Sequence, residues 1–272
     1  MQSKTLRDIL VLLTIGAALF AGGYFAVREI SKSDYDLSYQ VSMEQEEELG
    51  NLFKDLIWDK YPTVKNDYAD SAFQQIAKRL VSALDSTEYR YQFTIINNKQ
   101  VNAFTIPGGN IYMFSGLMEM ADSPEEVAAV LAHEIGHAEK RHVVTKLVNE
   151  MSMTVIISVL SGGDPSVVTQ MLQSVISNSF SREHEDEADK FALELLEAAK
   201  ISPKAMAKFF QKMNDKNMDY NEDLEFMMTH PHNNKRIERA RKYKTRNNFT
   251  AEPFTIDWKK VKTTLDPESE ND

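Results

Sequence analysis

The pattern of hydrophobic and polar positions begins with an uncharged run of 19 residues. Residues 9–27 carry no charged side chain, and basic residues flank the run on both sides. About 20 apolar residues are enough to cross a bilayer core. We interpret this run as a transmembrane anchor with residues 1–8 as a short cap. A cleaved signal peptide is the alternative, because Ala21-Gly22-Gly23 offers small residues for cleavage.

After a polar linker at residues 28–41, the pattern changes to helical spacing. Apolar residues recur at helical intervals from Ser42 and again over residues 67–85. Three short β-rich runs follow, at 91–97, 101–106 and 110–114, separated by polar residues and by Pro107-Gly108-Gly109. This alternation of short strands and turns predicts a small meander.

From Ser123 onwards the pattern is helical, with breaks at 162–165, 202–203 and 230–231. The apolar stretch 151–180 is interrupted, so it predicts a helical hairpin that packs over the site or touches a membrane surface. Residues 246–272 form a C-terminal extension with an acidic tail. The predicted fold is therefore α+β: one mainly helical domain at 42–245 with a small β-sheet, preceded by one transmembrane helix.

Charge and cysteine content exclude several functions. The formal net charge is −10, whereas a nucleic-acid binder needs a basic face to neutralise phosphates. There are no cysteines, which excludes thiol catalysis, disulfides and cysteine-ligated zinc. Any chemistry must come from other side chains.

Half of the six histidines lie in the sequence HEIGHAEKRH, residues 133–142. Ser123 and Pro124 suit the start of a helix, and Glu126 would complete a capping box. On that helix His133 and His137 are four residues apart and point to one side, with Glu134 about 100° away. Two imidazoles and an adjacent glutamate form the HExxH pattern, in which the histidines bind zinc and the glutamate acts as general base.

Solvated polar residues on an exposed helix are the simpler explanation, but the helix around them is the most apolar of the chain. Unpartnered polar groups are costly to bury, so one bound Zn²⁺ explains them better. On a continuing helix, His142 would lie about 180° from His133, which excludes it as a ligand. A third ligand must then come from another segment.

The third ligand is expected in residues 181–200. A helical projection places Ala188, Ala192, Leu195, Leu196 and Ala199 on the inward face and assigns Glu183, Glu187, Lys190, Glu194 and Glu197 to a solvated face. Glu185 and Asp189 point inward. We therefore predict Glu185 as the third zinc ligand and Asp189 as a hydrogen-bond acceptor for a ligand histidine. His184 is the weaker alternative for the ligand.

HEIGHAEKRH followed by SREHEDEAD resembles the gluzincin peptidases of the HtpX-like and CAAX prenyl protease type. VNAFTIPGGNIYMFSGLM and THPHNNKRI resemble further segments of the same family. The resemblance implies a zincin-type domain with HExxH and a later ExxxD. It also implies that Asn102, Ala103 and Phe104 belong to an edge strand beside the active-site cleft, which can pair with an extended substrate backbone.

His230 and Arg236 complete the candidate site. His230, followed by Pro231, is a candidate donor to the oxyanion of peptide hydrolysis, a fourth group on the zinc in a resting enzyme, or only a helix terminator. Arg236 is a second candidate donor or an anchor for a nearby carboxylate.

These observations predict a membrane-anchored zinc metalloendopeptidase without internal repeats. Its expected partners are unfolded or misassembled proteins and the membrane, and not nucleic acid. Basic residues before the anchor place its amino terminus inside, so the domain is expected outside the cytoplasm, in protein quality control. A non-proteolytic assembly factor or chaperone is the alternative, although such a protein has no need of Glu134. A structural zinc protein would need a fourth protein ligand.

Overall fold

The computed structural model describes residues 40–216, 225–230 and 234–265. The predicted cap, anchor and nearly all of the linker lie outside these residues, as does the end of the acidic tail. Among the described helices, none alone is long and apolar enough to span a membrane; only α6 and α7 together pass that test, across a bend of 103°.

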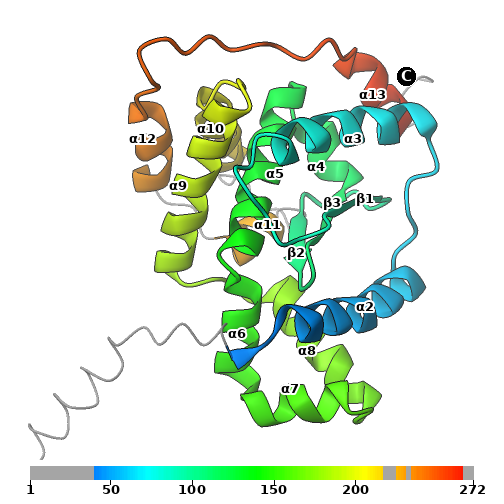
Figure 1. Cartoon of the computed structure of the whole chain (residues 1–272). Helices are drawn as coiled ribbons and strands as arrows, with labels where there is room; N and C mark the ends of the chain where they lie inside the picture. Colours follow the sequence, from blue (N-terminus) through cyan, green and yellow to red (C-terminus); the bar gives the residue numbers. More distant parts are fainter. Residues whose placement is uncertain (1–39, 217–224, 231–233, 266–272) are drawn as a thin grey trace, which may run out of the picture. The chain divides into compact units, whose positions relative to one another are not determined.

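The prediction of a mainly helical domain with a small sheet is confirmed (Figure 1). Helix α2 begins after Ser42, whose side chain forms a complete capping box with that of Gln45. The described helices are α2 (Met43–Lys60), α3 (Asp67–Val81), α4 (Ser115–Met120), α5 (Pro124–Glu139), α6 (His142–Met151), α7 (Met153–Leu160), α8 (Pro165–Ser177), α9 (Arg182–Ala198), α10 (Lys204–Lys216), α11 (Glu225–Thr229), α12 (Asn234–Lys242) and α13 (Trp258–Leu265).

The strands are β1 (Gln92–Ile96), β2 (Ala103–Ile106) and β3 (Asn110–Phe114), in the order β1-β3-β2. The predicted meander is wrong, because β1 pairs with β3 in parallel and does not pair with β2. The segment between β1 and β2 is no tight hairpin: the carbonyl of Asn98 accepts bonds from the Gly116 amide and the Ser115 hydroxyl. β2 is therefore an edge strand.

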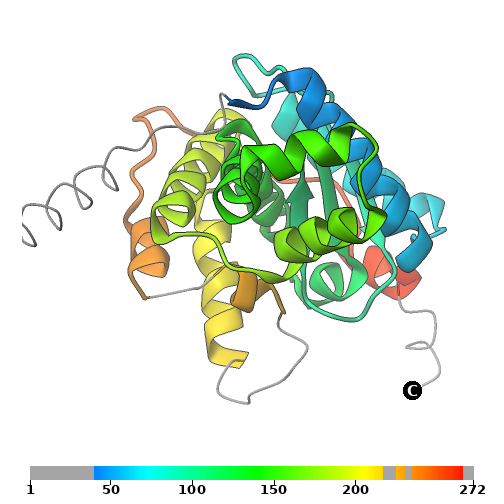
Figure 2. The same cartoon turned by 90° about the horizontal axis from the view of Figure 1, so that it is seen from below.

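The two faces of the sheet contact different helices. Side chains alternate along each strand, and Ala103 and Met113, a cross-strand pair, join the main core with α3 and α5. On the opposite face, the Phe104 ring stacks on Tyr112 with centroids 5.2 Å apart. Figure 2 views the molecule from that side, with α7 and α8 in front. The sheet is thus buried between two helical layers.

The start of α5 differs from the prediction. Pro124 occupies the first turn, but Ser123 makes no side-chain cap bond. The Glu126 carboxylate instead accepts the Asp122 amide at 3.0 Å and pairs with Lys212 at 3.0 Å. The predicted capping box is wrong because Glu126 is buried and already bound to these partners.

The helix that carries HEIGH ends before His142. Arg141 adopts a left-handed conformation (φ 53°). Its guanidinium donates to Glu46 at 2.9 Å and to the Val41 carbonyl at 2.7 Å, which holds the turn. The prediction of one continuous helix is therefore wrong. His142 begins α6 and turns back towards His137, although it stays outside the group of candidate metal ligands.

α5 and α9 form the largest helix-to-helix contact among the described elements. They approach closely at Gly136, where an added Cβ would lie 3.0 Å from the Ala188 carbonyl oxygen and 3.2 Å from the Ala188 Cα. Both atoms belong to a backbone, which cannot rotate away. Gly136 therefore sets the spacing between the helix of HEIGH and the helix of Glu185.

Gly136→Ala should destabilise the full chain by about 1–3 kcal/mol, the range expected for overpacking a tight core. On helix propensity alone the same change would stabilise by about 1 kcal/mol. Urea unfolding followed by circular dichroism gives the sign directly. A variant that is more stable than the wild type would show that the two helices separate without cost.

Candidate metal centre

α5 places its two histidines side by side. His133 and His137 are one helical turn apart and both are fully buried. Their Nε2 atoms lie 3.1 Å apart. Two imidazole nitrogens held so close face one common point, as metal ligands do.

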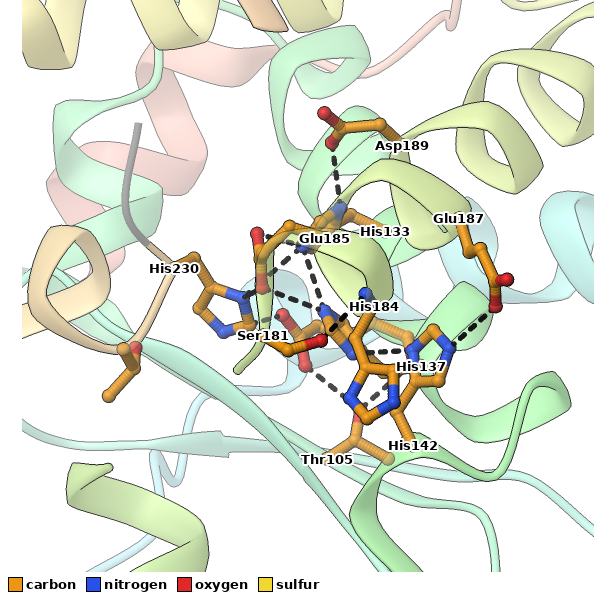
Figure 3. Close-up of polar contacts among 12 residues, drawn as sticks. Thr105, His133, His137, His142, Ser181, His184, Glu185, Glu187, Asp189 and His230 are labelled. Atoms are coloured by element: carbon orange, nitrogen blue, oxygen red, sulfur yellow. Dashed lines mark hydrogen bonds and ion pairs between the residues drawn. The ribbon is translucent and has the colours of Figure 1, made fainter. Parts of the chain in front are cut away.

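Glu185 of α9 and His230, which follows α11, complete the group. Glu185 Oε1 lies 3.3 Å from His137 Nε2, and Oε2 lies 3.5 Å from His133 Nε2. His230 Nδ1 lies 2.9 Å from Glu185 Oε1 and 3.2 Å from His133 Nε2. Figure 3 shows these side chains converging from three segments. One ligand atom from each of the four residues lies within 4.8 Å of the others.

These spacings fit zinc. Ligand bonds of about 2.0–2.1 Å in a tetrahedron put neighbouring ligand atoms about 3.3–3.4 Å apart, which matches the separations of Glu185 Oε1 and Oε2 from the two histidines of α5. The donor set of imidazoles and carboxylate, without thiolate, is also one that zinc accepts. The residues present therefore fit the metal that the sequence predicts.

Charge supports the same ion. Three carboxylates, Glu134, Glu185 and Asp189, are buried around the cluster, and Arg236 is the guanidinium buried with them. When the histidines are neutral, as metal binding requires, three carboxylates and one guanidinium leave two negative charges. Since buried charge is costly unless it is balanced, a divalent cation suits this site.

Arg236 binds the two buried carboxylates of α9, Glu185 and Asp189. Its Nε and Nη2 lie 2.7 and 2.6 Å from the two Asp189 oxygens, and its Nη1 lies 2.5 Å from Glu185 Oε2. Although burial opposes the charged forms, His230 and Arg236 hold the pKa of Glu185 well below its usual value, and Arg236 also lowers the pKa of Asp189. Both are therefore carboxylates, the form that a metal site requires.

Asp189 also orients His133, because its Oδ1 lies 3.1 Å from His133 Nδ1. Burial alone would lower the pKa of His133, but the neighbouring carboxylates of Asp189 and Glu185 outweigh burial and raise that pKa to about 9. Burial is also the main reason that the pKa of His137 lies well below its usual value. A metal ion would replace the proton on His133, so binding would release it.

Glu134 lies beside the cluster and is held from β2. The Thr105 hydroxyl lies 2.9 Å from Glu134 Oε2 and 3.0 Å from the Glu134 carbonyl. The other oxygen, Oε1, has no hydrogen-bond partner among the described residues and lies 3.5 Å from His230 Nε2. Sequence reasoning missed Thr105, and its only signal was a polar side chain in an otherwise apolar strand.

Two more residues escaped the sequence analysis. Phe180, which follows α8, stacks on the His137 ring with centroids 4.1 Å apart. Glu187 was assigned to the solvated face, but its Oε2 lies 3.1 Å from His142 Nε2. The side chain of Glu187 is nevertheless 60% exposed, as predicted. Glu197 is half-buried and accepts bonds from the Tyr243 hydroxyl and the Arg246 amide. A helical projection cannot show a partner from another segment.

The three residues expected at the substrate strand lie at the start of β2 and before it, and all are buried. The side chains of Ala103 and Phe104 pack into the two faces of the sheet. Asn102 differs: neither its amide nitrogen nor its amide oxygen has a hydrogen-bond partner in the described part of the chain. Such an unpartnered buried amide is costly, because it has lost its water partners without gaining protein ones.

The cluster is closed to solvent in this structure. His133, Glu134, His137, Glu185 and His230 are each at most 3% exposed. Access for a protein substrate would therefore need a displacement of His230, Phe180 or a neighbouring segment.

Comparison with known proteins gives relatives that are named as proteases. The chain is 25% identical over 256 residues to the Escherichia coli (strain K12) beta-barrel assembly-enhancing protease, covering 89% of this chain and 52% of the relative. It is 26% identical over 247 residues to the Schizosaccharomyces pombe mitochondrial metalloendopeptidase OMA1, covering 84% and 71%. The Arabidopsis thaliana protein of the latter name is 30% identical over 184 residues, covering 67% and 38%.

The chain thus spans about half the length of its bacterial relatives. The model of peptidase family M48 matches residues 68–244, which include every candidate ligand and Arg236. The site and this match agree with the family resemblance of the sequence motifs. The chain belongs to peptidase family M48.

Proposed function

We propose that this chain is a zinc-dependent metalloendopeptidase in which His133, His137 and Glu185 hold the metal. The observation that carries the proposal is the convergence of these three side chains, with ligand atoms 3.1–3.5 Å apart, next to a glutamate with one unpartnered oxygen. A structural site would have no use for that glutamate. Family membership supports the same activity.

Glu134 is the proposed general base. A zinc ion would supply a Lewis acid that polarises the scissile carbonyl and lowers the pKa of the attacking water. Glu134 Oε1 faces the cluster and takes the proton from that water, while the Thr105 hydroxyl fixes the other oxygen. His230 Nε2 is the proposed donor to the oxyanion of the tetrahedral intermediate.

Arg236 and Asp189 are proposed to position the ligands without touching the substrate. Arg236 holds the carboxylates of Glu185 and Asp189, and Asp189 in turn holds the ring of His133. Asn102, Ala103 and Phe104 are proposed to bind an extended substrate along the edge strand β2. The unpartnered amide of Asn102 supports this, because a substrate backbone offers both a donor and an acceptor.

The closed cluster supports a resting state in which His230 takes the position of the substrate. Its Nδ1 lies as close to Glu185 and His133 as a fourth ligand would. Opening would then withdraw His230 from the metal and turn its ring towards the substrate. The two roles of His230 are thereby compatible.

We further propose that the domain is anchored by residues 9–27, faces the outside of the cytoplasm and acts on unfolded or misassembled proteins. The uncharged run supports the anchor. The name of the beta-barrel assembly-enhancing protease supports a role in protein assembly. A non-proteolytic assembly factor on the same fold is the alternative, which Glu134 disfavours.

The full chain should bind about one Zn²⁺, as expected of a catalytic site with three protein ligands. His133→Ala, His137→Ala and Glu185→Ala should each lower the zinc content, because each removes one ligand. Elemental analysis after dialysis measures the content, with Glu183→Ala on the exposed face of α9 as the control. Full zinc content in Glu185→Ala would remove that residue from the ligand set.

Glu134→Gln should retain zinc and fold but lose the cleavage of casein, because an amide cannot accept the proton from water. Fluorescent casein, with zinc content measured in parallel, tests this. Casein cleavage near the wild-type rate would refute the role of Glu134 as general base. If the wild type binds unfolded protein but does not cleave it, the non-proteolytic assembly factor is favoured.

His230→Ala should lower kcat by about 10²–10³-fold, the loss expected for one preorganised oxyanion donor. Kinetics on a short quenched peptide measure the change, since a small substrate depends least on opening of the site. A rise in activity would show that inhibition outweighs catalysis at His230. Unchanged activity would leave it only as the residue that ends α11.

A further inference from the structure

A line of three side chains runs from the metal cluster to the surface. His137 Nδ1 lies 3.0 Å from His142 Nδ1, and His142 Nε2 lies 3.1 Å from Glu187 Oε2 (Figure 3). The side chains of His137 and His142 are 0% and 3% exposed, whereas that of Glu187 is 60% exposed. Neither His142 nor Glu187 belongs to the ligand group or to the mechanism above.

The hydrogens on this line can take only one arrangement when His137 binds the metal. His137 Nε2 faces the cluster and must offer its lone pair, so its hydrogen is on Nδ1. That hydrogen is donated to His142 Nδ1, which must then carry none. His142 therefore holds its hydrogen on Nε2 and donates it to Glu187. Each imidazole nitrogen on this line then has one role, as either a donor or an acceptor.

We propose that His142 and Glu187 are positioning residues that orient His137 and strengthen it as a metal ligand. This inference rests on the proposed function, because it assumes that His137 binds zinc. A carboxylate at the end of the line makes His142 a better acceptor, and His142 in turn makes the His137 ring a stronger electron donor. Partners of this kind orient metal-binding histidines and commonly change metal affinity about 10–100-fold.

The two ligand histidines of α5 are thus supported differently. His133 contacts a buried carboxylate, Asp189, directly. His137 reaches an exposed carboxylate through a second imidazole. Both carboxylates come from α9: Asp189 lies two residues after Glu187, and the ligand Glu185 lies two residues before it. One helix therefore supplies a ligand and the support for both other ligands.

His142 is held in place on several sides. The left-handed Arg141 turns the chain so that His142 faces His137. The His184 ring stacks on His142 with centroids 4.3 Å apart and an interplanar angle of 15°. Phe180 fixes the His137 ring from another side. Neither imidazole can rotate freely, which is what a positioning role requires.

The test measures zinc affinity of the full chain by competition with a chelating indicator. His142→Phe keeps a flat ring for stacking but removes both nitrogens, and should weaken zinc binding about 10-fold or more. Glu187→Ala should weaken it by less, about 3-fold or more, since His142 remains. His142→Gln should restore part of the affinity, because an amide can both accept and donate. Glu183→Ala is the matched control on the exposed face of α9.

Coupling separates this role from a general structural effect. If Glu187 acts only through His142, the double variant His142→Phe/Glu187→Ala should bind zinc as the single variant His142→Phe does. Wild-type affinity in Glu187→Ala, or additive losses in the double variant, would overturn the proposal. Glu187 is exposed, so its variants should fold even where His142→Phe does not. A wild type without zinc would instead overturn the proposed function.

Discussion

The close approach of α5 and α9 at Gly136 is the constraint on which the metal centre depends. Because Gly136 has no Cβ, the Ala188 backbone comes within reach of the helix that carries the two histidines. Glu185 and Asp189 lie on either side of Ala188 in the sequence, so they arrive opposite those histidines. Two helices that pack at one glycine therefore determine the distances among three candidate ligands.

Burial of so many charges would be costly without compensation. Arg236 provides part of it by contacting two carboxylates of α9 with three nitrogens. A planar guanidinium is suited to this, because its fork of donors matches the oxygens of a carboxylate. The single positive charge of Arg236 cannot neutralise three carboxylates, and with neutral histidines the remaining negative charge favours a divalent cation at the same place. Packing, charge and the choice of metal are thus linked.

Local periodicity was sufficient to predict much of the fold and of the candidate site. The helices that begin after Ser42 and at Pro124, and the inward direction of Glu185 and Asp189, follow from 3.6-residue spacing, which depends on neighbours along the chain. The order of the strands in the sheet cannot be predicted from local periodicity, because β1 and β3 are paired although β2 lies between them in the sequence. Contacts made across the fold leave no periodic signal.

The same limit explains which residues of the centre were missed. Thr105 reaches Glu134 from a strand 29 positions earlier, and His142 reaches its partners only because Arg141 breaks the helix. A helical projection assumed that α5 continued, and it therefore placed His142 on the opposite side. The third histidine of HEIGHAEKRH was still a signal, since a buried imidazole needs partners for both nitrogens.

The elements that close the centre come from outside α5 and α9. Phe180 lies in the short connection between α8 and α9, and its amide donates to the Thr229 carbonyl at 3.2 Å. His230 follows directly after Thr229. One backbone hydrogen bond therefore joins the segment that stacks on His137 to the segment that carries His230. The Phe180 and His230 rings also meet, with centroids 5.5 Å apart, so these two segments contact each other directly. The ligands of α5 and α9 are thus fixed by helix packing, whereas the two segments that close the centre are joined by one backbone hydrogen bond and one ring contact.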